Sequence, residues 1–246
     1  MKRLIPAIAA LVLLSATARA QFTTVGKIEF ERKVNVYAQM EEMEENEWFE
    51  RIKSQIPKFS STYFDLVFDS AHSLYKPGRE PETPPVKMWG GGPATDNIVY
   101  SDFAAKRVSA TKIVFEQKFL VQDSIRKMDW KAKEEIRTIA GYKCHKAVGR
   151  ICDSVYVVAF YTEDIVVNGG PEMFGGLPGM ILELAIPRLH TTWVATKVDM
   201  VTPKAADFTA PEKGKKVTGA GLYQTIKDSF KDWGKSAARN IWWAML

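Results

Sequence analysis

The sequence predicts a mainly β fold of the α+β class, a curved antiparallel sheet or half-barrel with an N-terminal helix and a C-terminal helix. Short segments of alternating apolar and polar residues recur between turn residues, which is typical of an antiparallel meander. Helical spacing of apolar residues occurs near each end of the chain. Without residues 1–20, the chain has 246 − 20 = 226 residues, enough for one large β-rich domain or at most two small ones.

Residues 1–20 have the three parts of a secretory signal peptide. Lys2 and Arg3 form a positive start, residues 4–14 are mostly apolar, and Ala18-Arg19-Ala20 is an A-x-A cleavage site. This apolar run is shorter than the roughly 20 residues that span a bilayer, and no later run is long enough. We therefore expect export to the periplasm, the outer membrane or the medium, and no transmembrane segment in the mature chain.

The charge balance gives little support to a nucleic-acid partner. Three of the 34 basic residues leave with the leader, so the mature chain, with its 29 acidic residues, is close to neutral. The chain also has no basic stretch interleaved with aromatic residues, which nucleic-acid binding would need. We expect no nucleic-acid partner.

The β domain is predicted over residues 21–203. Within 25–39, Ile28, Phe30 and Val34 share one parity, which indicates a half-buried strand. Residues 40–56 place apolar side chains three to five positions apart among glutamates and stop at Pro57, which predicts one amphipathic helix.

The next segments are short strands bounded by turn residues. Residues 63–68 and 71–75 are expected to form a hairpin around Asp69-Ser70, and the proline- and glycine-rich residues 77–94 an irregular excursion. Residues 204–246 are predicted to be an irregular tail followed by a helix over 222–243. The remaining strands are predicted at 98–103, 108–121, 128–130, 136–147, 152–161, 180–186 and 191–202.

The two cysteines of an exported protein are read first as a disulfide. Cys144 and Cys152 would lie opposite each other on adjacent strands if the chain turned around Val148-Gly149. Such a short loop would gain about 2–3 kcal/mol from the bridge. The alternative is a buried thiol with an unrelated second cysteine.

The most distinctive stretch is the glycine-rich segment that precedes strand 180–186. Pro178-Gly179 suits the centre of a type II turn, and Gly175-Gly176 would let a backbone or a ligand approach closely. It is no phosphate loop, since no Lys-Ser or Lys-Thr follows. The segment is either a tight corner feeding a core strand or a ligand or partner surface. The residues assigned to such a surface are Tyr161, Phe174, Gly175, Gly176, Leu177, Pro178 and Gly179.

The same segment resembles a known family. Gly176-Leu177-Pro178-Gly179-Met180-Ile181 matches five of six positions of the hexapeptide that names the bacterial GLPGLI family, with Met180 in place of leucine. Trp130 and the run Gly141-Tyr142-Lys143-Cys144-His145-Lys146-Ala147 are similar to further elements of that family. Phe160 departs from its usual tryptophan and Val166 from its proline. The resemblance, over about 130–186, implies an exported envelope protein with a curved antiparallel sheet and no established activity.

The sequence contains no recognisable catalytic or metal-binding pattern. Its three histidines do not have the spacing of a zinc site, and no G-x-S-x-G or Cys-His signature occurs. Glu183 lies between two leucines and would need Arg150 or Lys146 as a partner if buried. We expect no cofactor and a non-catalytic protein that binds an apolar ligand, a peptide or an outer-membrane partner. The alternative is a secreted peptidase-like hydrolase with an unrecognised site at Cys144, His145 or Glu183.

Overall fold

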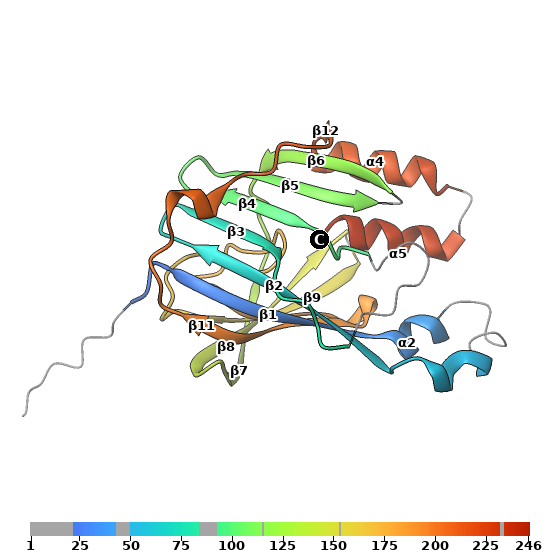
Figure 1. The fold of residues 1–246 in the computed structure, drawn as a ribbon, viewed down its shortest axis with the longest axis horizontal. Helices are drawn as coiled ribbons and strands as arrows, with labels where there is room; N and C mark the ends of the chain where they lie inside the picture. The colour runs from blue at the N-terminus through green and yellow to red at the C-terminus, as the bar shows by residue number, and fades with distance from the viewer. Residues whose placement is uncertain (1–21, 43–49, 84–92, 115, 153, 232–233) are drawn as a thin grey trace, which may run out of the picture.

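The computed structural model describes residues 22–42, 50–83, 93–114, 116–152, 154–231 and 234–246 (Figure 1). The predicted leader over 1–20 lies outside these residues. The described chain is mainly β, as predicted, and its strands form one open twelve-stranded sheet.

Two antiparallel meanders make up most of the sheet. The first contains β1 Gly26–Asn35, β2 Phe59–Phe68, β3 His72–Pro77, β4 Ile98–Asp102, β5 Arg107–Val114 and β6 Gln117–Ser124. The second contains β7 Lys131–Ile139, β8 Tyr142–Ile151, β9 Val155–Thr162, β10 Met180–Ile186 and β11 Thr191–Asp199. Antiparallel pairing of β1 with β11 joins the meanders, and β12 Lys215–Val217 adds a parallel edge strand beside β6.

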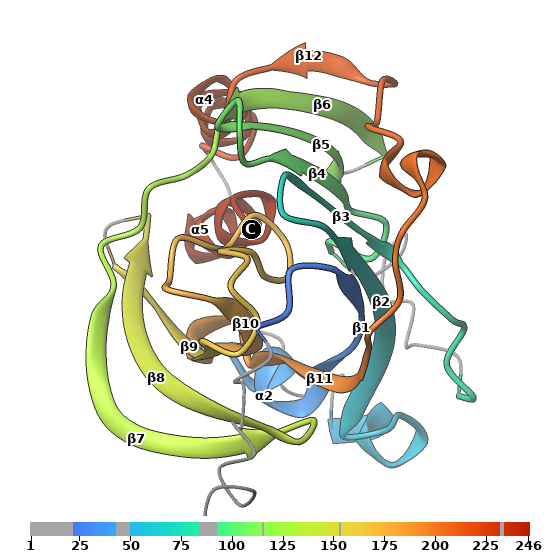
Figure 2. The ribbon, with the colours of Figure 1, turned by 90° about the vertical axis from the view of Figure 1, so that its left-hand side faces the viewer.

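The sheet curls around a filled interior (Figure 2). The interior holds α5 Gly234–Ala244 and the loop over 163–179, which connects β9 to β10, whereas α4 Gly219–Ser229 lies beside β6. Trp243 and Leu246 at the end of the chain and Phe174 and Leu177 of the loop belong to one buried cluster. We call residues 163–179 the interior loop.

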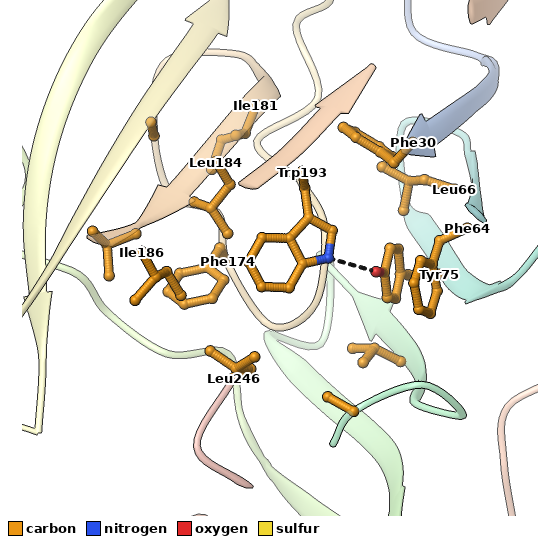
Figure 3. Packing of buried hydrophobic residues seen from close by; sticks show 14 of the residues in the cluster. Phe30, Phe64, Leu66, Tyr75, Phe174, Ile181, Leu184, Ile186, Trp193 and Leu246 are labelled. Carbon is orange, nitrogen blue, oxygen red and sulfur yellow. Dashed lines mark hydrogen bonds between the residues drawn. The ribbon is translucent and has the colours of Figure 1, made fainter. Parts of the chain in front are cut away.

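The core follows from strand alternation. Ile28 and Phe30 of β1 and Phe64 of β2 share the inward parity and are fully buried. Figure 3 shows Trp193 of β11 at the centre of the cluster, where its Nε1–H donates to the Tyr75 hydroxyl at 3.1 Å. A buried indole therefore has the polar partner that it needs.

Two segments predicted as single strands are hairpins. Residues 108–121 divide into β5 and β6, and residues 136–147 into β7 and β8. The turns contain Glu116 and Ala140, both with positive φ, a conformation that neither residue type signals in a sequence. The predicted strand at 128–130 is not a strand, whereas β10 has its predicted bounds.

The helices also differ from the prediction. The C-terminal helix predicted over 222–243 is two helices, α4 and α5. The N-terminal helix predicted over 40–56 is described only in part, because 43–49 lie outside the described residues. A helix α2 covers Val36–Glu41, and residues 50–52 are helical.

The predicted disulfide is wrong. No disulfide joins Cys144 to Cys152. The chain does not turn at Val148-Gly149, because β8 runs through both residues to Ile151 and the turn to β9 begins at Cys152. Eight residues of strand therefore separate the cysteines, roughly 25 Å, far beyond the reach of a disulfide.

Candidate functional site

The glycine-rich corner lies at the C-terminal end of the interior loop, and most of it is buried. The structure buries five of the seven residues assigned to a ligand or partner surface, namely Tyr161, Phe174, Gly175, Leu177 and Gly179. Gly176 and Pro178 are exposed. This burial is typical of a tight corner that feeds a core strand, the first of the two alternatives drawn from the sequence.

Close backbone approach explains two of the glycines. A Cβ on Gly175 would lie 2.5 Å from the Asn168 carbonyl oxygen, and one on Gly179 would lie 2.0 Å from the Thr162 carbonyl oxygen. The turn is a γ-turn around Pro178, in which the Gly179 N–H donates to the Leu177 carbonyl at 2.7 Å. It replaces the expected type II turn because the Met180 N–H donates to the Ile165 carbonyl instead.

Trp130 fastens this corner to the neighbouring sheet. Its Nε1–H donates to the Gly175 carbonyl at 2.9 Å. A Cβ on Gly149 of β8 would lie 2.9 Å from the Trp130 ring, so the indole packs against bare backbone there. The missing side chain of Gly149 therefore gives the Trp130 indole room to pack, and Gly149 does not form the turn that the sequence suggested.

The interior loop also carries a buried carboxylate that sequence reasoning missed. Glu172 is 2% exposed and has φ of 56°, in the left-handed region that costs a non-glycine residue about 1–2 kcal/mol. Its Oε2 accepts from Asn97 Nδ2 at 2.7 Å and its Oε1 from the Tyr75 hydroxyl at 3.4 Å. The loop therefore holds a strained acidic residue inside the sheet.

Buried cations surround this carboxylate. Lys112 of β5 is 2% exposed and interacts electrostatically with Glu172. Arg32 of β1 is 3% exposed and donates to the Pro93 and Ala94 carbonyls at 3.0 and 2.8 Å. The sequence contained a signal for the burial of Arg32, because this residue has the same strand parity as the inward-facing Ile28 and Phe30.

Burial dominates the electrostatics of the cluster. It lowers the pKa of Lys112 from 10.5 to about 8, although the Glu172 carboxylate acts in the opposite direction. Burial likewise raises the pKa of Glu172, against the electrostatic effect of Lys112 and the hydrogen bond from Asn97. Desolvation thus outweighs pairing for both groups.

An open groove of about 310 Å³ lies on the outer face of β2. Phe59 is 47% exposed, and the ammonium groups of Lys33 and Lys58 lie 6.0 and 5.6 Å from its ring centroid. The Tyr63 ring is covered by the Arg79 guanidinium at 3.3 Å. The groove is lined by Pro57, Phe59, Ser60, Ser61, Tyr63, Pro81, Glu82 and Thr83. We call it the β2 groove.

The side chains considered for hydrolysis do not come together. Cys144 is buried, and burial raises the pKa of its thiol to about 12. Its strand neighbour His145 lies beside Tyr161, with 6.1 Å between ring centroids, and adjacent strand residues face opposite sides. Glu183 pairs with Arg137 at 3.0 Å, a partner that the sequence did not suggest.

The described parts of the chain meet neither the requirements of a metal site nor those of a membrane-spanning helix. These parts contain no group of three or more His, Cys, Asp or Glu side chains able to hold a metal ion. Among the described helices, none has both the length and the apolar character needed to cross a membrane.

Comparison with known proteins gives a family and a fold. The family model described as "N-glycanase peptide, N-terminal domain" matches residues 95–224, more than half of the chain. No curated protein matches. The structure is similar to PNGF-II in its C2 crystal form, with a TM-score of 0.52 and 14% identity over 90% of this chain and 33% of that one. In the P21 form the TM-score is 0.51, with 16% identity over 85% of this chain and 34% of that one.

These identities support a shared fold alone, and the chain spans about a third of the length of PNGF-II. The family match does not depend on these identities. It covers β4, β5 and β6 of the first meander and all of the second, and it continues into α4. The chain belongs to the family of N-glycanase N-terminal domains.

Proposed function

We propose that this chain is a non-catalytic binding domain and that it binds carbohydrate in the β2 groove. The observation that carries the proposal is the groove itself, whose volume of about 310 Å³ falls in the range of small-ligand sites. One wall is the exposed Phe59 ring, and two prolines together with hydroxyl and carboxylate side chains line the remainder.

This combination suits a sugar because a pyranose has both apolar and polar surfaces. Its C–H faces can stack on an aromatic ring such as Phe59, which is rigid and contributes a large apolar area. Its hydroxyl groups can exchange hydrogen bonds with Ser60, Thr83 and Glu82 at the same groove. Ser61 already donates to Glu31 at 2.6 Å, so its hydroxyl is held in place.

The family description points in the same direction. An N-glycanase is named for glycans, and the family is that of its N-terminal domain. A domain that binds glycan beside a separate catalytic part would account for a sheet in which Cys144, His145 and Glu183 do not assemble. We therefore prefer binding to the hydrolase alternative, and we place the ligand in the groove instead of at the buried glycine corner.

We further propose that the domain is exported. The support is the leader-like sequence of residues 1–20 and the resemblance of 130–186 to the GLPGLI family of envelope proteins. N-terminal sequencing of the protein from the envelope and from the medium of its own cells tests this. A start near Gln21 supports export, and a start at Met1 overturns it.

The binding proposal is tested by screening residues 21–246 on an array of N-glycans and glycopeptides, followed by calorimetric titration of the best ligand. The variant Phe59→Ala should weaken binding at least tenfold, about 1.4 kcal/mol, because it removes the stacking surface. Tyr156→Ala is the matched control, since Tyr156 is 57% exposed on β9, outside the groove. Absence of glycan binding, or equal effects of the two substitutions, would refute the proposal.

A further inference from the structure

The interior of the sheet contains more positive than negative charge among its described residues. Arg32 and Lys112 are buried and Arg126 is half-buried, and Glu172 is the buried carboxylate among them. Nearer the surface, Asp96 acts electrostatically on Arg32 and Asp123 on Arg126. Arg126 follows β6, and its guanidinium lies 5.7 Å from the centroid of the Phe174 ring. A buried charge without compensation costs several kcal/mol, so the surplus needs an explanation.

The hydrogen bonds show where the surplus lies. Arg32 donates to Thr62 and to two carbonyls, and both oxygens of Glu172 accept hydrogen bonds. Two buried nitrogens have no partner among the described residues, Lys112 Nζ and Arg126 Nη1. Lys112 interacts electrostatically with Arg126 as well as with Glu172.

A small cavity lies beside this cluster. Its volume is about 20 Å³, and the residues with polar side chains that line it are Ser73, Ser101, Arg126, Asn168 and Glu172. Apart from Glu172, these side chains can all donate hydrogen bonds. The space fits one water molecule or one halide ion and is too small for a phosphate or a sugar.

We propose that this cavity is a binding site for one small monovalent anion of chloride size, held by Arg126, with the buried Lys112 outside the cavity lining as a second positive charge that acts electrostatically. The anion would give Arg126 Nη1 its missing acceptor and offset the cationic surplus. Repulsion from Glu172 is partly offset because Lys112 and Arg32 act on its carboxyl group electrostatically, and Asn97 and Tyr75 donate hydrogen bonds to its oxygens.

The position of the cavity gives the ion a structural role. Ser73 and Ser101 belong to β3 and β4, whereas Asn168 and Glu172 belong to the interior loop. An anion shared by these groups would tie the interior loop to β3 and β4 of the first meander. In the sheet these strands lie about half the sheet away from β9 and β10, which the loop connects. The site is separate from the β2 groove and does not depend on the proposed function.

The test uses the full chain without its leader, residues 21–246. In a crystal soaked in sodium bromide, an anomalous peak in the cavity within hydrogen-bond distance of Arg126 is expected. In solution, the Tm should rise with chloride relative to methanesulfonate at equal ionic strength. At chloride tenfold above its Kd the expected rise is roughly 3–6 °C.

Two variants separate the site from general salt effects. Lys112→Met should lose the chloride-dependent rise in Tm, and Arg107→Met, which removes an exposed cation from the same strand, should keep it. If Lys112→Met does not fold, the bromide soak of the unmodified protein still decides. No bromide in the cavity, together with equal Tm values in chloride and methanesulfonate, would overturn the proposal.

Discussion

Alanine substitutions at three glycines of the corner should separate backbone strain from steric overlap. Gly176 has φ of +83°, and a Cβ on it would have no atom within 4 Å, so alanine there meets strain alone. Gly175 lacks a positive φ, but a Cβ on it would lie 2.5 Å from the Asn168 carbonyl oxygen. Alanine at this position would therefore cause steric overlap without backbone strain. Gly179 combines φ of +152° with a Cβ 2.0 Å from the Thr162 carbonyl oxygen.

The expected losses in the free energy of unfolding follow from these geometries. Gly176→Ala should cost about 1–2 kcal/mol, the strain of a left-handed non-glycine residue. Gly175→Ala should cost about 1–3 kcal/mol, as overpacking of a dense region does. Gly179→Ala should cost about 3–5 kcal/mol, because both effects act and the overlapped atom is backbone at the end of β9.

Urea unfolding followed by tryptophan fluorescence measures the three values, provided that the unfolding is two-state. Gly176→Ala is the internal control because it changes the same corner without an overlap. If Gly176→Ala costs as much as Gly179→Ala, close approach of the backbone does not determine this corner. A cost below about 1 kcal/mol for Gly179→Ala would refute the reasoning in the same way.

Two further predictions concern the buried lysine and the cysteines. Because burial lowers the pKa of Lys112 to about 8, the folded state binds fewer protons than the unfolded state between that pH and 10.5, so stability should rise with pH there. In chloride-free buffer, the free energy of unfolding measured by urea titration should increase by about 2 kcal/mol from pH 7 to 9.5. This increase should vanish in Lys112→Met, and an unchanged increase in the variant would contradict the prediction. Without reductant, alkylation of the unfolded protein should label both Cys144 and Cys152, and dithiothreitol should leave the Tm unchanged. A mass showing fewer than two labels would contradict the strand geometry.

The elements that sequence reasoning located well are those whose local signals are strong. Strand β10 was predicted with its observed bounds because Pro178-Gly179 marks where it begins. The hairpin of β2 and β3 was confirmed, with Asp69 accepting from the His72 backbone N–H in the turn. In both cases turn residues next to apolar runs carry the information.

The errors in the predicted strands and turns arose where the backbone adopts a conformation that the residue type at that position does not favour. Ala140 turns the chain between β7 and β8 with φ of 47°, and Cys152 does so between β8 and β9 with the same value. Neither residue type predicts a turn, whereas Gly149, which does, lies inside a strand against Trp130. The predicted disulfide failed for this reason.

The sequence by itself determined the class of fold, the antiparallel meander and the importance of the glycine corner, because alternation and turn residues act over a few neighbouring positions. Only the tertiary structure decided that the corner is buried, that Glu172 meets Lys112 inside the sheet, and that an open groove lies at Phe59. These features depend on contacts between residues far apart in the chain, such as Asn97 and Glu172. The energy of burying a charge depends on what surrounds it in space, and local pattern does not contain that information.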